Sequence, residues 1–117
     1  MKEKEIQVYC LRYLKAKGYY FGRVNTGGIK RGNVWCLNPY TLKGVPDIIG
    51  FRENIRVWKN GFEDVMAYPR GKIMFAIECK SSTGKLSPDQ IKFKEYFEAS
   101  GGLYIVARKA EDVEGVL

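Results

Sequence analysis

Hydrophobic residues near the N-terminus recur at the spacing of one helix face. Four of them stand at positions i, i+4, i+7 and i+8, namely Ile6, Cys10, Tyr13 and Leu14. Residues at these spacings share one side of an α-helix, and Gly18 follows as a stop signal. The pattern therefore predicts a first helix over residues 2–17.

Short apolar and β-prone runs, separated by turn residues, follow in the middle of the chain. They predict strands over 19–26, 48–51, 72–80 and 103–107, a hairpin over 55–67, and a short strand or an excursion between 29 and 43. Asn60 and Gly61 form a two-residue hairpin turn signal. The run from Ile73 to Ile77 is unbroken, which is typical of a strand in the centre of a sheet.

A second helix is predicted from its capping residues. Ser87 is suited to the N-cap, Pro88 to the first helical position, and Gln90 to the third position of a capping box. We expect this helix to end at the glycines after Ser100. Its expected buried side chains are Ile91, Phe93 or the stem of Lys94, Tyr96 and Phe97. Residues 110–116 predict a short closing helix.

The order of these elements predicts an α/β fold, with a mixed central β-sheet flanked by helices. A chain of 117 residues has room for one hydrophobic core, so residues 1–117 are expected to form a single domain. No apolar run approaches the roughly 20 residues that span a bilayer, and the N-terminus lacks the apolar stretch of a signal peptide. We expect a cytoplasmic protein of a bacterial or phage-infected cell, without a membrane partner.

Composition narrows the possible chemistry. The chain contains no histidine, which excludes Ser-His-Asp and Cys-His catalysis and histidine-based zinc sites. Its three cysteines are widely spaced, so they form neither a disulfide framework nor a CxxC metal pair. The formal net charge is +7, which favours a polyanionic partner such as DNA. The alternative is that the excess of lysine and arginine only keeps the protein soluble.

Two carboxylates stand at strand boundaries. Asp47 precedes one apolar run, and Glu78 ends another with Lys80 two residues later. Side chains two residues apart in a strand point to the same side, so Glu78 and Lys80 would project together. If Asp47 and Glu78 converge, they and the Cys79 carbonyl offer an oxygen-only site suited to Mg²⁺ or Mn²⁺. The alternative is an ordinary Glu78–Lys80 ion pair at a strand end.

Three short motifs give this arrangement its specificity. They are Gly44-Val45-Pro46-Asp47, then Glu78-Cys79-Lys80, then Leu86-Ser87-Pro88-Asp89-Gln90. In this order they resemble the G-x-PD, ExK and L-S-x-x-Q pattern of the VRR-NUC family, in the PD-(D/E)xK nuclease superfamily. The resemblance implies a restriction-endonuclease-like core. It also implies that Asp47 and Glu78 bind metal, that Lys80 is the catalytic lysine, and that Gln90 supports the site.

The same family places a glutamate on the first helix, where this chain has two candidates. Glu3 lies about 60° from Ile6 around the helix axis, on the side of Cys10, whereas Glu5 lies about 100° away on the other side. Helical phase therefore favours Glu3 as the residue that completes the acidic cluster. The alternative is that Glu3 only interacts favourably with the helix dipole.

Several basic and polar residues are candidates for contact with DNA phosphates. They are Arg23, Asn25, Lys30, Arg31, Lys43 and Lys85. Asn25 precedes the Gly27-Gly28 pair, where the missing side chains permit a backbone to approach closely. The alternatives are that this segment only turns the chain and that each lysine or arginine is a solvated surface residue.

These observations predict a metal-dependent, structure-selective DNA endonuclease of the stand-alone VRR-NUC type. The family resemblance suggests branched DNA such as Holliday junctions as substrate, and hence DNA repair. Two cuts on a two-fold junction favour a homodimer. The alternatives are a catalytically silent nucleic-acid-binding module, a restriction-type nuclease on the same core, and a nuclease for flapped DNA or RNA.

Overall fold

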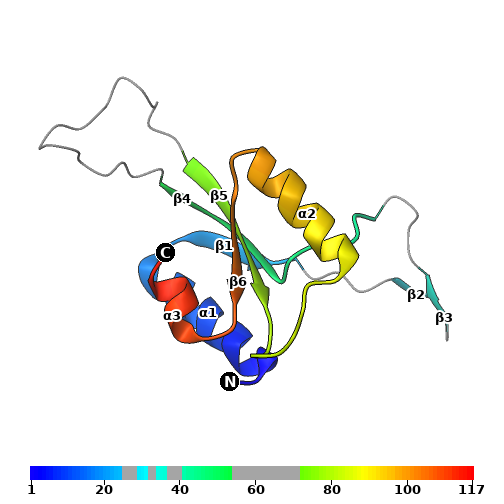
Figure 1. Ribbon diagram of the computed structural model, residues 1–117, viewed down its shortest axis with the longest axis horizontal. Coiled ribbons are helices and arrows are strands. Elements are labelled where there is room, and N and C mark those ends of the chain that lie inside the picture. The colour runs from blue at the N-terminus through cyan, green and yellow to red at the C-terminus, as the bar shows by residue number, and fades with distance from the viewer. Residues whose placement is uncertain (25–28, 32–33, 37–40, 54–71) are drawn as a thin grey trace, which may run out of the picture.

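The computed structural model describes residues 1–24, 29–31, 34–36, 41–53 and 72–117, and its centre is a four-stranded sheet (Figure 1). The strands lie in the order β1 (Tyr20–Arg23), β4 (Ile48–Glu53), β5 (Lys72–Cys79) and β6 (Leu103–Ala107). β4 pairs antiparallel with both β1 and β5, and β5 pairs parallel with β6. The sheet is therefore mixed, as predicted, and the apolar run of β5 occupies an internal position.

A second, two-stranded sheet lies between β1 and β4 in the sequence. It consists of β2 (Ile29–Arg31) and β3 (Val34–Cys36), which pair antiparallel. The region expected to hold a short strand or an excursion thus contains two short strands. Residues 25–26, expected at the end of the first strand, and the hairpin expected over 55–67 lie outside the described residues.

Helices cover both faces of the main sheet (Figure 1). α1 (Glu3–Lys17) and α3 (Ala110–Glu114) contact each other, and α1 also packs on β5, whereas α2 (Pro88–Ala99) packs on β6. The β5 side chains that join the core beside α1 are Phe75, Ile77 and Cys79. Successive side chains of a strand point to opposite faces, so Glu78 faces the other side of the sheet. α2 lies on that side, because Gln90 hydrogen bonds to Glu78.

The ends of α1 and α2 form as their sequences predict. α1 stops at Gly18, which adopts a left-handed conformation with φ of 78°. At the start of α2, the Ser87 hydroxyl accepts from the Gln90 backbone N–H, and the Gln90 side chain accepts from the Ser87 N–H, which completes the capping box. Of the helices described, none combines the length and the hydrophobicity that a membrane span requires.

The expected buried face of α2 is partly wrong. Ile91 and Tyr96 are 43% and 69% exposed, and no residue of α2 is fully buried. The inward side chains are Phe93 and Phe97, which stack on each other with ring centroids 5.7 Å apart. They share one side of the helix with Gln90, since steps of 100° per residue bring all three within about 60°. Ile91 and Tyr96 fall on the flanks of this narrow contact.

Candidate metal centre

A tight turn, residues 44–47, holds Asp47 at the start of β4. Gly44 has a φ of 72°, and a side chain there would collide with the backbone of Asp89 at the start of α2. The Asp47 carbonyl accepts from the Val24 N–H at 3.1 Å, and its Oδ2 accepts from the Cys79 N–H at 2.8 Å. The backbone of Asp47 is thus held by the chain that leaves β1, and its carboxylate is held by β5.

Glu78 lies near the end of β5 and is only 3% exposed. Its Oε1 accepts from the Gln90 side-chain amide at 2.9 Å and lies 3.8 Å from the Lys80 ammonium. Among the residues that the structure describes, its buried Oε2 has no hydrogen-bond partner. A buried carboxylate oxygen without a partner carries a large desolvation cost, so Glu78 is prepared to accept a further positive ligand.

The surroundings of Glu78 raise its pKa to about 7. Burial is the largest cause, the negative charge of Asp47 adds to it, and the positive charge of Lys80 opposes it. A shift of this kind is common where carboxylates gather in a functional site. Without a cation, Glu78 is therefore protonated in a large fraction of the molecules near neutral pH.

Three carboxylates come together at this end of the sheet. One oxygen from each of Glu3, Asp47 and Glu78 lies within 4.8 Å of the other two. Such a set of hard oxygen ligands suits a small divalent cation, and the unpartnered Oε2 of Glu78 gives the same indication. Glu5, the other candidate on α1, is not a member of this cluster.

A small cavity of about 260 Å³ adjoins the cluster and is lined in part by Cys79. The thiol of Cys79 lies in the core beside Cys10, so the backbone of Cys79 is the part that borders the site. The hydrogen bond with the Cys10 thiol, and then burial, raise the pKa of the Cys79 thiol. The thiol therefore stays protonated, which leaves the Cys79 carbonyl as the candidate ligand.

The cavity also contains two residues that were not expected from the sequence, Lys4 and Gln7. Gln7 follows Glu3 by four positions on α1, so the two share one helix face. This four-residue spacing is the sequence pattern from which Gln7 could have been predicted. The side-chain amide of Gln7 lies one helical turn from Glu3.

A family model described as the VRR-NUC domain matches residues 2–111, which extends from the start of α1 into α3. The chain belongs to the VRR-NUC family. Its members are nucleases with a PD-(D/E)xK-like fold, and such nucleases typically use divalent metals. A search of curated proteins gave no match, and neither did a search of solved structures.

Two further residues shape the VRR-NUC site without having been expected from the sequence. Arg108, just after β6, donates through Nη1 to the carbonyls of Ser81 and Gly84 at 2.7 and 2.6 Å. It thereby fastens the loop that leads from Lys80 to α2. Tyr104 on β6 has a buried hydroxyl that no group in the described part of the chain hydrogen bonds, and burial together with the charge of Glu78 raises its pKa.

The expected DNA-contacting residues of this VRR-NUC chain are only partly placed. Arg23 is exposed at the end of β1. It pairs there with Ile48, the residue that follows Asp47. Lys43 is exposed just before the Gly44 turn, and Lys85 is exposed in the loop that precedes α2. Lys30 and Arg31 lie in β2, and Asn25 lies outside the described residues.

Proposed function

We propose that this protein is a metal-dependent endodeoxyribonuclease that hydrolyses phosphodiester bonds with Mg²⁺ or Mn²⁺. The ligands would be Glu3, Asp47, Glu78 and the Cys79 carbonyl. The observation that carries the proposal is the convergence of three carboxylates, of which Glu78 also has a buried oxygen without a hydrogen-bond partner among the described residues. Membership of a nuclease family supports the same chemistry.

A bound divalent ion would supply a water molecule of lowered pKa and neutralise charge that develops on the phosphate. The protein's own groups prepare the site for it. The Cys79 N–H orients Asp47, and the Gln90 amide orients Glu78. Lys80, whose side chain is 15% exposed, supplies a positively charged donor to orient the attacking water or to stabilise the phosphorane-like transition state.

We further propose branched DNA, such as a Holliday junction, as the substrate, and a homodimer as the working form. The net charge of +7 favours a polyanion, and the exposed residues Arg23, Lys43 and Lys85 would contact backbone phosphates of the DNA. A two-fold junction cut on two strands requires two sites, which a symmetric dimer provides. The protein would act in DNA repair, in the cytoplasm of a bacterial or phage-infected cell.

A cleavage assay tests the nuclease activity. Purified protein is incubated with labelled four-way junction, flap, linear duplex, single-stranded DNA and RNA, in Mg²⁺, Mn²⁺ or EDTA. We expect cleavage of the junction with either metal and none in EDTA. Binding without cleavage would instead support a silent module, and preference for another substrate would support a flap-type, restriction-type or RNA nuclease. Light scattering measures the oligomeric state.

Matched variants connect the activity to the site. Asp47→Asn and Lys80→Ala are expected to lower the cleavage rate by about 10² or more. Glu3→Gln should lower it too, whereas Glu5→Gln, two residues further along the same helix, should leave it within twofold. Asp47→Asn or Lys80→Ala proteins that cut as fast as wild type would overturn the mechanism.

A further inference from the structure

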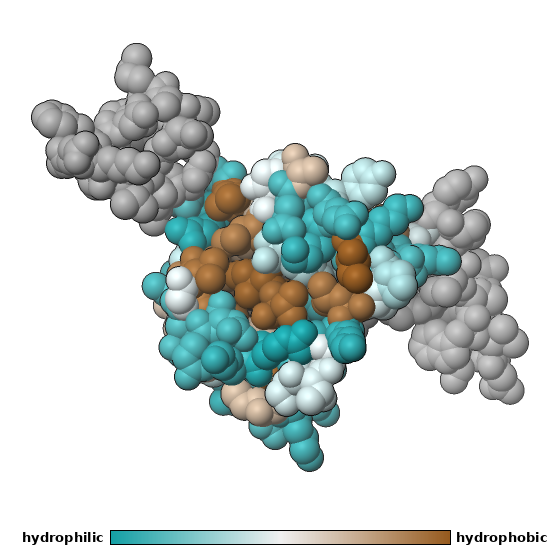
Figure 2. Space-filling model, in the orientation of Figure 1, coloured by the Kyte–Doolittle hydropathy of each residue, from teal (hydrophilic) through white to brown (hydrophobic). Residues whose placement is uncertain are grey.

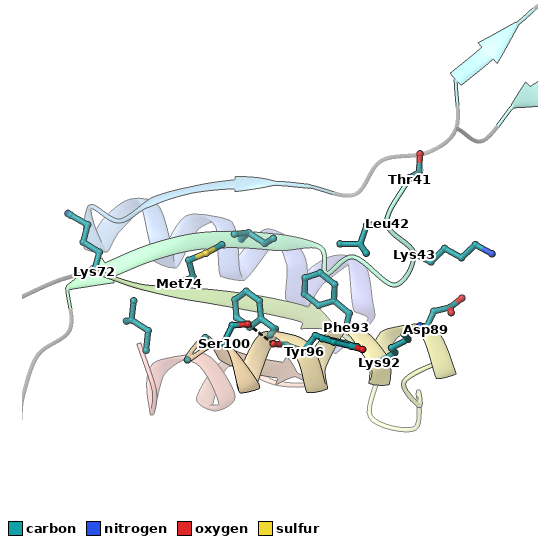
Figure 3. A pocket seen from close by; sticks show the side chains of 15 residues that line it. Thr41, Leu42, Lys43, Lys72, Met74, Asp89, Lys92, Phe93, Tyr96 and Ser100 are labelled. Carbon is teal, nitrogen blue, oxygen red and sulfur yellow. Dashed lines mark hydrogen bonds between the residues drawn. The ribbon is translucent and has the colours of Figure 1, made fainter. Parts of the chain in front are cut away.

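A second and larger cavity, which we call the α2 groove, lies between α2 and the β4–β5 part of the sheet (Figure 3). Its volume is about 1220 Å³, against about 260 Å³ for the cavity beside the acidic cluster. The groove is lined mainly by apolar and aromatic side chains, including Met74, Phe93 and Tyr96. Figure 2 shows a different part of the surface, the face on which β6 lies in front, where hydrophobic residues gather in the centre with hydrophilic ones around them.

The α2 groove adjoins the candidate metal centre. Gln90, which holds Glu78, is followed on the same side of α2 by Phe93 and then Phe97, both of which line the groove. At 1.5 Å per residue, Phe93 lies only about 5 Å along the helix from Gln90. Lys43 also lines the groove and directly precedes the turn that holds Asp47. A ligand that fills the groove would therefore reach toward the candidate metal centre.

The charges around the α2 groove favour an anionic occupant. Its described lining includes three lysines, Lys43, Lys72 and Lys92, and one carboxylate, Asp89. A symmetric contact with a second copy would bring the same lysine-rich rim against itself, which is unfavourable. Phosphates, by contrast, would neutralise the lysines while an apolar group enters between them.

Tyr96 provides a surface for such a group. Its side chain is 69% exposed, and the Phe93–Phe97–Tyr104 cluster of rings does not include it. Every nucleobase has a face that can stack on an aromatic ring, and proteins that bind single strands combine such rings with basic grooves. Duplex bases, in contrast, are already stacked on one another and do not offer their faces.

From this geometry we infer that the α2 groove binds a single-stranded segment of DNA beside the cut site, with an unstacked base against Tyr96 and backbone phosphates on the lysines. The inference rests on the proposed nuclease function and specifies its substrate. A flap supplies unpaired nucleotides beside its branch point, and a four-way junction supplies them when base pairs at its branch point open, whereas an intact linear duplex offers none.

Fluorescence anisotropy in EDTA tests the groove independently of cleavage. We expect Tyr96→Ala to weaken binding of a single-stranded oligonucleotide about tenfold, with little change for a blunt duplex of the same length. Tyr96→Phe should retain the affinity, because the ring remains. The matched control is Tyr20→Ala, which removes a tyrosine that is 80% exposed on β1 and should bind like wild type. An oligonucleotide containing 2-aminopurine should lose fluorescence on binding wild type but not Tyr96→Ala.

Each outcome decides the question. Wild-type protein that does not bind single strands, or a Tyr96→Ala protein with wild-type affinity, overturns the inference. So does a dimer that Tyr96→Ala dissociates without changing DNA affinity, since the groove would then hold a second copy. If wild type cuts nothing in Mg²⁺ but Tyr96→Ala loses single-strand binding, the nuclease proposal fails and the groove assignment stands.

Discussion

At the scale of single residues, Glu78 combines deep burial with two negative neighbours. It is 3% exposed, and one oxygen from each of Asp47 and Glu3 lies within 4.8 Å of one of its own. Gln90 and Lys80 both approach Oε1, which leaves Oε2 unsatisfied. The metal-free site therefore opposes folding when Glu78 is ionised, and a divalent cation would relieve that opposition.

This residue makes the stability of the metal-free protein depend on pH. The pKa of Glu78 rises from 4.5 to about 7 on folding, so between these values the folded state keeps a proton that the unfolded chain releases. The stabilisation is complete below pH 4.5 and is lost as pH rises to about 7. The loss amounts to about 3 kcal/mol. Urea denaturation in EDTA at several pH values measures this loss. We expect the unfolding free energy of wild type to fall relative to that of Glu78→Gln as pH rises.

Addition of Mg²⁺ at neutral pH should raise the stability of wild type much more than that of Glu78→Gln, because a neutral amide is a weaker ligand for the ion than a carboxylate. A constant difference between the two proteins from pH 4.5 to 7 would show that Glu78 ionises in the fold as it does in the unfolded chain.

Several site residues were predictable from local sequence alone. Glu78 and Lys80 follow from strand alternation, and helical phase placed Glu3 on the side of α1 that the structure turns toward Asp47. Gln7 was missed, although it follows Glu3 at helical spacing. Arg108 was missed because its partners are backbone carbonyls 24 and 27 residues away, and no local pattern encodes such a contact.

At the scale of elements, the Gly44 turn and the start of α2 are in close backbone contact. Gly44 and Gly18 have similar left-handed conformations, with φ of 72° and 78°, but only Gly44 has a neighbour that a Cβ would strike. Gly18→Ala should therefore cost only about 1 kcal/mol of unfolding free energy, from backbone strain. Gly44→Ala should cost about 3 kcal/mol or more, because strain and steric overlap add. Urea titration of both variants checks this difference, and equal losses would contradict it.

Two residues at the start of α2, Ser87 and Gln90, allow the effect of helix capping on stability to be distinguished from the effect of Gln90 on the site. Ser87→Ala removes the hydroxyl that accepts from the Gln90 N–H and should lower stability by about 1 kcal/mol, with cleavage within twofold of wild type. Gln90→Ala also removes the amide that holds Glu78, so we expect a cleavage rate at least about tenfold lower. Denaturation and single-turnover cleavage measure the two effects. Equal cleavage by both variants would show that Gln90 acts through the helix alone.

Element positions were largely predictable, because strand and helix periodicities are local properties of the sequence. The pairing of β4 with β5, which sets Ile48 opposite Ile77 and so brings Asp47 to Glu78, was not, because register depends on segments far apart in the chain. The orientation of α2 was mistaken for a related reason. Its apolar residues occupy more than one side, and only contact with Glu78 and Tyr104 selects Phe93 and Phe97 as the inward pair.

At the scale of the whole molecule, the net charge of +7 should govern affinity for DNA. Each lysine that neutralises a phosphate releases counterions, so the logarithm of the binding constant falls linearly with the logarithm of salt concentration. Lys43→Ala should reduce this slope by about one. Lys15→Ala, an exposed lysine in the last turn of α1, should lower the slope little. Anisotropy titrations between low and physiological salt measure both, and equal reductions would contradict a localised binding face.

The Gln90 side chain connects these scales through one polarised amide. Its oxygen accepts from the Ser87 N–H while its nitrogen donates to Glu78. If the amide were rotated by 180°, its N–H groups would face the Ser87 N–H, and its oxygen would face the Glu78 carboxylate. Donor would then meet donor and acceptor would meet acceptor, so only one orientation of the amide is favourable. The hydrogen-bonded chain from Ser87 through Gln90 to Glu78 thus has a direction. Loss of negative charge at Glu78 weakens the hydrogen bond from Gln90 to Glu78. The first turn of α2 would then be held less firmly to β5.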